Sequence, residues 1–118
     1  MDTSNYSDLS KTWIFDLDGT LVLHNGYKSG TDTLLPGVKE FFETKIKNGD
    51  YVLILTARKS EYKNITEKFL FDNGIFYDKI IYDLPVGERL LFNDKKESGL
   101  ITSYCFNLKR DEGLCQLD

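Results

Sequence analysis

Short apolar runs alternate along the chain with segments whose apolar residues recur at helical spacing. The runs predict strands, at residues 12–17, 51–55, 80–82, 90–92 and 101–106. The periodic segments predict two helices, at about 36–48 and from Ser60 to just before Gly74. This order of strands and helices favours a parallel sheet with helices on its faces.

Each predicted helix has recognisable boundary residues. Pro36 stands where a first helical position is expected, and Gly49 where a left-handed cap is expected. Ser60 can cap the second helix, which closes at Gly74. Its predicted apolar face consists of Tyr62, Ile65, Phe69 and Leu70.

The segment between the first strand and the first helix is polar and contains a turn signal. Asn25-Gly26 favours a hairpin, so residues 21–35 are expected to form a small flap and not a second domain. The chain is expected to be a single domain over residues 1–118, with a polar N-terminal segment (1–11) and a C-terminal tail (111–118). No stretch is long enough for a cap domain.

Composition narrows the class of protein. A net charge of -4 over 118 residues argues against a nucleic-acid surface, which normally carries a basic patch. Cys105 and Cys115 lack zinc-ligand spacing, and Cys105 is expected to be a small buried hydrophobe. Neither a signal peptide nor an apolar stretch long enough to span a bilayer is visible, so a cytoplasmic protein without membrane contact is expected.

Polar residues follow three of the predicted strands. Asp16 and Asp18 end the first, Thr56 follows the second, and Asn93 and Asp94 follow the fourth. Ligands of open parallel sheets bind at the carboxyl ends of the strands, so these side chains are expected to converge there. Two carboxylates this close oppose mutual ionisation, and a hard dication that takes oxygen ligands relieves the repulsion.

Three short motifs in this chain resemble those of a known family. Asp16-Leu17-Asp18-Gly19-Thr20, Leu55-Thr56-Ala57-Arg58 and Phe92-Asn93-Asp94 resemble the first, second and fourth motifs of the haloacid dehalogenase superfamily. The resemblance runs over about residues 12–110. It implies a three-layer, Rossmann-like α/β fold and Mg²⁺-dependent phosphatase activity. The chain also resembles small uncapped members of bacterial capsule and surface-sugar biosynthesis, which implies a sugar phosphate as substrate.

The resemblance also implies a role for each motif residue. Asp16 would be the nucleophile and a metal ligand, Asp18 the general acid–base with its main-chain carbonyl on the metal, and Asp94 a further metal ligand. The Thr56 hydroxyl and the main chain near Ala57 would bind phosphate. The secondary site residues are Gly19, which lets the backbone approach the site, Asn93 and Arg58.

The superfamily's third motif supplies a lysine near the phosphate, and its usual position here is Leu84, ahead of Pro85. Lys79 and Lys95 are the alternatives, and an ammonium group from either would neutralise charge on the transferring phosphoryl group. Arg58 and Arg110 are the remaining cationic candidates, and His24 in the flap is a candidate for contact with substrate.

Other functions stay open at this point. An uncapped site is open to water, which suggests either a macromolecular substrate or an oligomer in which one subunit covers the site of another. Composition favours a small phosphorylated metabolite over nucleic acid. A receiver domain of two-component signalling and a catalytically impaired relative that binds a phosphorylated ligand or a partner protein are the alternatives.

Overall fold

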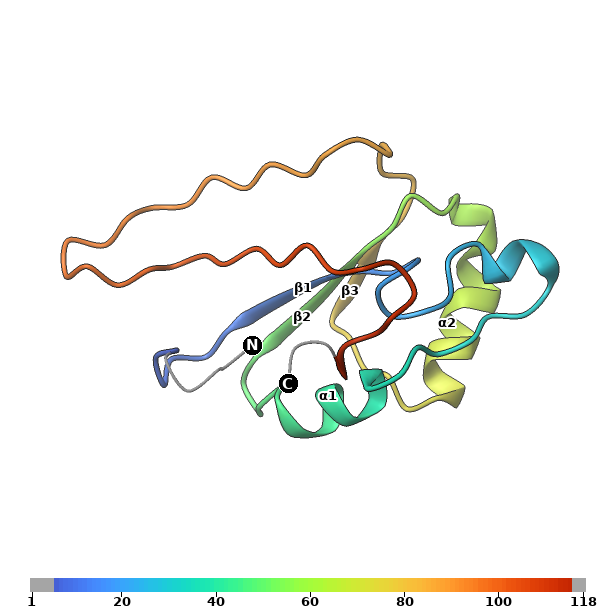
Figure 1. Cartoon of the computed structure of the whole chain (residues 1–118), viewed down its shortest axis with the longest axis horizontal. Coiled ribbons are helices and arrows are strands. Elements are labelled where there is room, and N and C mark those ends of the chain that lie inside the picture. Colours follow the sequence, from blue (N-terminus) through green and yellow to red (C-terminus); the bar gives the residue numbers. More distant parts are fainter. Residues whose placement is uncertain (1–5, 116–118) are drawn as a thin grey trace.

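The computed structural model describes residues 6–115 and contains a three-stranded parallel sheet with two α-helices (Figure 1). The strands are β1 (Thr12–Asp16), β2 (Tyr51–Leu55) and β3 (Lys79–Ile81), in the spatial order β1-β2-β3. Asp16 pairs with Leu55 and Leu55 with Ile81. The carboxyl ends of all three strands therefore lie at one edge of the sheet, as the sequence predicted.

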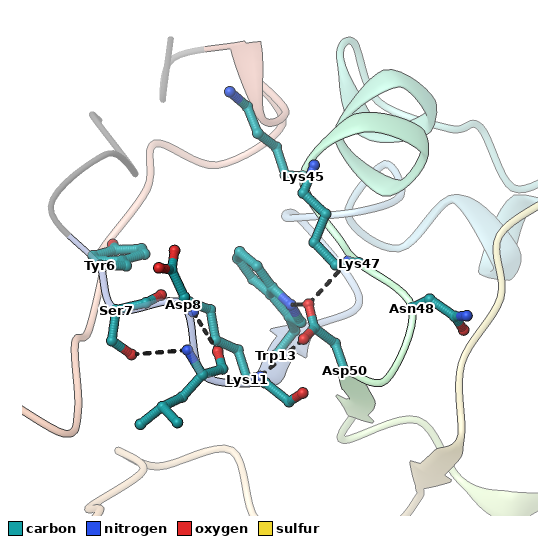
Figure 2. A pocket seen from close by; sticks show the side chains of 11 residues that line it. Tyr6, Ser7, Asp8, Lys11, Trp13, Lys45, Lys47, Asn48 and Asp50 are labelled. Atoms are coloured by element: carbon teal, nitrogen blue, oxygen red, sulfur yellow. Dashed lines mark hydrogen bonds between the residues drawn. The ribbon is translucent and has the colours of Figure 1, made fainter.

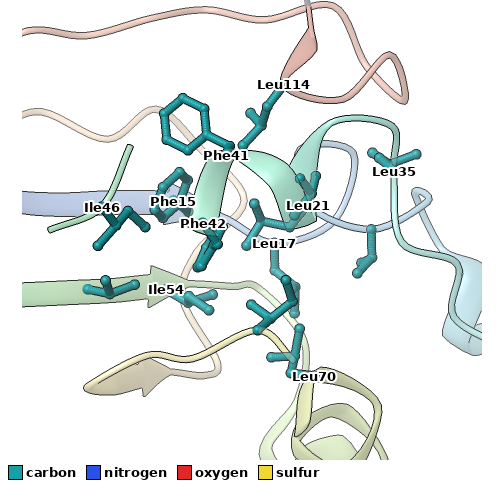
Figure 3. Close-up of a cluster of buried hydrophobic side chains, with 14 residues drawn as sticks. Phe15, Leu17, Leu21, Leu35, Phe41, Phe42, Ile46, Ile54, Leu70 and Leu114 are labelled. Atoms are coloured by element: carbon teal, nitrogen blue, oxygen red, sulfur yellow. The ribbon is translucent and has the colours of Figure 1, made fainter. Parts of the chain in front are cut away.

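Both α-helices cover the same face of this sheet. Helix α1 (Val38–Thr44) connects β1 to β2, and helix α2 (Lys63–Asp72) connects β2 to β3. Both connections move across the sheet in the same direction, so right-handed crossovers place both helices on one side of it. The core confirms this, because Phe42 of α1 and Leu70 of α2 belong to one cluster with Phe15 and Ile54 of the sheet (Figure 3). The described chain thus has two layers, and the third layer that was predicted is not formed.

The other face of the sheet is only partly covered. Ile14 is 48% exposed and Tyr51 is 45% exposed, and Leu53, Leu55 and Ile81 are half-buried. The outer edge of β1 has no strand partner among residues 6–115. An apolar face and an unpaired strand edge therefore lie side by side next to Asp16.

The helices differ in detail from their predicted spans. α1 has 7 residues and begins after Gly37, whose φ of 77° is left-handed, so the prediction of 36–48 was too long at both ends. Ser60 does not cap α2 but begins a short 3₁₀ turn, η3 (Ser60–Tyr62), that leads into it. Gly74 closes this segment with a φ of 72°, as predicted.

The predicted apolar face of α2 was partly wrong. Ile65 is 52% exposed, whereas Thr66 and Leu70 are the buried residues of the helix. Thr66 is buried because its hydroxyl accepts a hydrogen bond from Arg58 at 2.8 Å. A buried polar partner, which hydrophobic periodicity cannot reveal, therefore sets the orientation of this helix.

The flap (residues 21–35) exists and its two legs pair antiparallel, through a bridge between Val22 and Leu34, but Asn25-Gly26 does not form a tight turn between them. Asn25 has a φ of 58° and is followed by a short 3₁₀ helix, η2 (Gly26–Ser29). Val22 ties the flap down through isolated bridges to Asp18 and Leu34. The flap is therefore fastened directly to the turn that carries the paired carboxylates.

The strands predicted at 90–92 and 101–106 are absent. Residues 84–106, here called the arm, form a long excursion whose two legs run out from the body of the protein and back, drawn in orange and orange-red in Figure 1. The legs are tied by an Asn93 side-chain bond to the Thr102 carbonyl at 3.0 Å. Cys105 is exposed, contrary to the prediction. These segments have strand-like composition, but a strand requires a partner edge, and here neither leg has one.

The arm exposes an unusual amount of apolar surface. Its large hydrophobic side chains that are at least 36% exposed are Val86, Leu90, Leu91, Phe92, Leu100, Ile101, Tyr104 and Phe106. So many exposed large apolar side chains within one segment are typical of a surface that normally has a partner.

After the arm, the chain returns and packs on the flap and α1. Leu114 is 2% exposed and donates its N–H to the Pro36 carbonyl at 3.0 Å. Asp111 donates its N–H to the Gly19 carbonyl at 2.9 Å and accepts the His24 N–H at 2.8 Å. The first residues of the expected C-terminal tail (111–118) therefore hold the Asp16–Thr20 turn in place.

Within residues 6–115 no helix is both long and apolar enough to cross a membrane.

Gly113 permits this packing, and its replacement tests the arrangement. Its φ is 76°, and a Cβ at this position would collide with the Pro36 carbonyl. We expect Gly113→Ala to lower the free energy of unfolding by about 1–3 kcal/mol, because it adds a collision to left-handed strain. Gly30→Ala is the matched control, since Gly30 has a φ of 97° but no atom within 4 Å of a Cβ. Urea denaturation of both variants measures this, and equal losses would contradict close packing at Pro36.

Candidate active site

Asp16 is the last residue of β1, and its carboxylate is accessible. Its side chain is 40% exposed and forms an ion pair with Arg89 of the arm at 2.9 Å. The Thr20 hydroxyl donates to the other carboxylate oxygen at 3.3 Å. Asp16 therefore has the position and the exposure that a nucleophile needs, with a cation beside it.

The turn after Asp16 is tight because one carbonyl closes it. The Leu17 oxygen accepts the N–H groups of Thr20, Leu21 and Val22 at 2.9–3.3 Å. Gly19 has a φ of 87°, and a Cβ there would lie 3.3 Å from Cγ of Arg110. Glycine therefore suits this position both by its conformation and by its small size.

The carboxylate of Asp18 contacts a buried guanidinium, that of Arg58. Its two carboxylate oxygens accept from Nε and Nη2 of Arg58, at 2.9 Å for the shortest of these bonds. The side chain of Asp18 is 16% exposed and that of Arg58 is 1% exposed. This two-point geometry fixes the plane of the Asp18 carboxylate.

Arg58 is also held from its other edge. Asp32 of the flap accepts from Nη1 at 3.0 Å and from Nη2 at 2.6 Å, and Thr66 accepts from Nη1 at 2.8 Å. Together with the bonds to Asp18, these use all five N–H donors of the guanidinium. Arg58 therefore has no donor left for a phosphate oxygen, so the prediction of Arg58 as a cationic phosphate ligand does not fit the structure.

Tyr27 covers one face of the same guanidinium. Cζ of Arg58 lies 4.1 Å from the centre of the Tyr27 ring, and Tyr62 packs edge-on against that ring at 4.8 Å. Burial alone would lower the pKa of Arg58, but its hydrogen bonds to Asp32 and Asp18 raise that pKa above its ordinary value. Arg58 therefore stays charged at any pH at which the protein is folded.

The Thr56 hydroxyl is engaged within the protein. Thr56 is 1% exposed, and its hydroxyl accepts the Arg58 N–H at 3.0 Å and lies 3.4 Å from the Asp18 carboxylate, to which it donates. Ala57 is half-buried in the turn between them. The second motif is thus next to the first, as predicted, but it contacts Asp18 directly and not an open phosphate position.

The fourth motif does not join the other two in this structure. Asp94 has a side chain that is 75% exposed and pairs with Lys96 at 3.3 Å, and its neighbours Asn93 and Lys95 lie on the same exposed arm. In residues 6–115, no three His, Cys, Asp or Glu side chains come together in a group that could hold a metal ion. The predicted convergence of Asp94 with Asp16 is therefore not seen here.

The candidate lysines do not complete the site either. Lys79 is exposed and is the first residue of β3, where it pairs with Leu53 of β2. It therefore lies two residues before the carboxyl end of β3 at Ile81. Arg110 lies against the Gly19 turn. His24 is half-buried and is held by its main-chain bond to Asp111. The cation that the structure does place on Asp16 is Arg89.

Sequence reasoning missed Asp32, Thr66 and Arg89. Asp32 and Thr66 lie 26 and 8 residues from their partner Arg58, and Arg89 lies 73 residues from its partner Asp16. None belongs to a recognisable motif, and no local spacing connects them. The one available signal was the flap itself, where Tyr27 shares a short polar segment with Asp32.

A hollow in the described chain lies at the opposite end of the sheet. It measures about 320 Å³ and is lined by residues before β1 and β2, among them Tyr6 and Asp50, and by Trp13 near the start of β1 (Figure 2). Asp50 accepts from the Trp13 indole at 2.8 Å and from the N–H groups of Lys11 and Lys47 at 2.9 Å. These bonds outweigh the effect of burial and lower the pKa of Asp50. Asp50 thus joins the starts of the two strands and is separate from the carboxyl-end site.

Comparison with known proteins gives a limited likeness. No protein-family profile matches the chain, and no curated protein does. It is similar to a chain in the structure of the Pnkp1/Rnl/Hen1 RNA repair complex, with 35% identity, a TM-score of 0.53, and coverage of 70% of this chain and 30% of that one. A second structure of the Pnkp1/Rnl/Hen1 complex gives 34% identity and a TM-score of 0.54, over 76% of this chain and 35% of that one.

The chain therefore spans about a third of the length of the solved proteins it matches. The likeness supports a shared fold for most of the described chain.

Arg58 is expected to be essential for stability. Arg58→Met would leave Asp18 and Asp32 buried without their cation, which costs about 3–5 kcal/mol in the free energy of unfolding. Lys68→Met is the control, because it breaks an exposed pair with Asp72 and should cost no more than about 0.5 kcal/mol. Urea denaturation measures both, and a loss at Arg58 no larger than that at Lys68 would rule out the two-carboxylate clamp.

Proposed function

We propose that this protein is a Mg²⁺-dependent phosphohydrolase of the haloacid dehalogenase superfamily that works through an aspartyl-phosphate. One observation carries the proposal: an accessible carboxylate, Asp16, ends a parallel strand two residues before a second carboxylate, Asp18, that is held rigidly by a buried cation. The structural likeness to the RNA repair chains is consistent with this α/β arrangement.

The proposed chemistry divides two steps between the two carboxylates. An oxygen of Asp16 attacks phosphorus and forms a P–O bond, while the bond from phosphorus to the leaving oxygen breaks and Asp18, which is protonated at the start of the cycle, gives that oxygen its proton. Water then attacks the aspartyl-phosphate, Asp18 takes its proton, and inorganic phosphate and free Asp16 are regenerated. Splitting one displacement into two in this way is the advantage of covalent catalysis.

The donor chemistry suits Mg²⁺, but only part of the predicted ligand set is in place. The Asp16 carboxylate and the Asp18 carbonyl supply hard oxygen donors at one edge of the sheet, whereas Asp94 lies on the arm. When bound, the ion would reduce repulsion between a carboxylate nucleophile and an anionic phosphate.

We therefore propose that the active form has the arm packed on the outer edge of β1. Two observations support this: that edge is unpaired, and the arm exposes apolar residues of strand-forming type such as Leu91 and Phe92. Strands added there would extend the parallel sheet and would bring Asp94 to the end of a strand beside Asp16. Arg89 would have to release Asp16 in the same movement.

Two substrate classes are in question. The acidic composition favours a small phosphorylated metabolite, and the resemblance to surface-sugar phosphatases suggests a sugar phosphate. The likeness to chains of an RNA repair complex instead favours a phosphorylated RNA end. A catalytically impaired, ligand-binding protein is the remaining alternative, and the pairing of Arg89 with Asp16 is the observation in its favour.

The decisive assay measures Mg²⁺-dependent release of phosphate from two panels, one of sugar phosphates and one of RNA oligonucleotides with a 3′- or 5′-phosphate. We expect Asp16→Asn to lower turnover by about 10³-fold or more, because the nucleophile is lost. Acid-quenched wild-type protein should carry a hydroxylamine-labile phosphoryl group that Asp16→Asn lacks. Asp72→Asn, an exposed carboxylate on α2, is the control and should keep full activity.

Residual turnover near the wild-type rate in Asp16→Asn would overturn the nucleophile assignment. Wild-type protein that releases no phosphate from any member of either panel would support the impaired, ligand-binding alternative.

Packing of the arm can be followed by hydrogen exchange in the presence of Mg²⁺ and fluoroberyllate. We expect amides in residues 90–92 and 101–104 to exchange about tenfold more slowly or better, because strand pairing protects them. Asp16→Asn with the same additives is the control for the ligand, and β2 is the internal reference. Slow exchange already in the free protein supports the same pairing, whereas fast exchange throughout, in protein that releases phosphate, contradicts it.

A further inference from the structure

The flap is the part of the site whose function the motifs do not explain. It was expected to contact substrate, yet two of its residues, Asp32 and Tyr27, are turned toward Arg58. We propose that Asp32 and Tyr27 are positioning residues that act through Arg58 to fix the Asp18 carboxylate for proton transfer. This inference rests on the proposed phosphohydrolase function.

Asp32 fixes Arg58 within the plane of its guanidinium. Its side chain is 5% exposed, and its two oxygens accept from both terminal nitrogens of Arg58, at 2.6 and 3.0 Å. Asp18 holds the adjacent edge through Nε and Nη2. A planar group gripped on two edges by two-point contacts cannot rotate without breaking charge-assisted hydrogen bonds.

Tyr27 limits movement out of that plane. Its ring lies over the guanidinium at 4.1 Å and is itself backed by Tyr62. The effect of this environment is visible at Tyr27, whose pKa is raised by burial and by the negative charge of Asp18. The flap therefore covers the cation, and Asp18 is the member of this cluster that belongs to the Asp16–Thr20 turn.

The exposure of the side chains decreases from Asp16 inward to Arg58, as expected if buried residues position an accessible site. Exposure of the side chains falls from 40% at Asp16 to 16% at Asp18, 5% at Asp32 and 1% at Arg58. Two carboxylates share one guanidinium, so the cluster carries a net negative charge that is tolerated only with all of its hydrogen bonds made. The orientation of Asp18 therefore depends on Asp32, although the two carboxylates make no bond to each other.

Orientation matters most for a group that transfers a proton. General acid help is worth roughly 10²–10⁴-fold and depends on the position of the donor relative to the leaving oxygen. A misplaced Asp18 should therefore penalise substrates whose leaving group is basic, and it should spare those whose leaving group departs without a proton. This difference separates positioning from a purely structural contribution, which would affect both kinds of substrate alike.

The test compares kcat/KM for phenyl phosphate and p-nitrophenyl phosphate, two substrates of similar shape whose leaving groups differ in basicity. In Asp32→Asn we expect kcat/KM to decrease more for phenyl phosphate than for p-nitrophenyl phosphate. The ratio of the two values should change by about tenfold or more relative to wild type. Asp50→Asn is the matched control, because Asp50 is also a hydrogen-bonded carboxylate but lies at the opposite end of the sheet. In this variant the ratio of kcat/KM for the two substrates should equal that of wild type.

The Tyr27 variants provide a second measurement if Asp32→Asn does not fold. Tyr27→Ala removes the ring and should change the ratio in the same direction, whereas Tyr27→Phe keeps the ring and should restore the wild-type ratio. An equal fall for both substrates in folded Asp32→Asn or Tyr27→Ala would overturn the positioning role and leave the proposed function intact. Wild-type protein inactive on both substrates and on both phosphate panels would overturn the proposed function and this inference together.

Discussion

The buried guanidinium of Arg58 is the interaction on which the site depends. Arg58 lies in the turn after β2, and its partners come from three other segments: Asp18 from the turn after β1, Asp32 and Tyr27 from the flap, and Thr66 from α2. Removing such a cation from two buried carboxylates would cost more than most single contacts in a protein of this size. One residue therefore coordinates the placement of four segments that are distant in the sequence.

The second constraint is the unfinished sheet. Three strands with both helices on one face leave an apolar face and a bare β1 edge, and the arm leaves apolar side chains exposed to water. These two features lie in the same chain and are chemically complementary. They give a physical reason why the candidate site is only half assembled: Asp16 and Asp18 belong to the packed body, and Asp94 belongs to the arm.

Local patterns predicted the elements whose cause is local. The three parallel strands of the body were found from short apolar runs, and the site at their carboxyl ends followed from the residues after them. The left-handed conformations of Gly49 and Gly74 were also predicted, but Gly49 does not cap α1, which ends at Thr44. Predictions that required a distant partner were wrong: the strands of the arm, the burial of Cys105 and of Ile65, and the two-sided covering of the sheet.

For the site the same division holds. The sequence by itself determined that Asp16 and Asp18 end a strand beside Thr56, because strand, turn and register are set by nearest neighbours along the chain and across one crossover. Only the tertiary structure decided that Arg58 faces inward. A guanidinium can bind either a phosphate or buried carboxylates, and the sequence does not reveal which of these lies next to it. Its neighbours come from the flap and α2, and hydrogen bonds between such distant segments leave no pattern in the sequence.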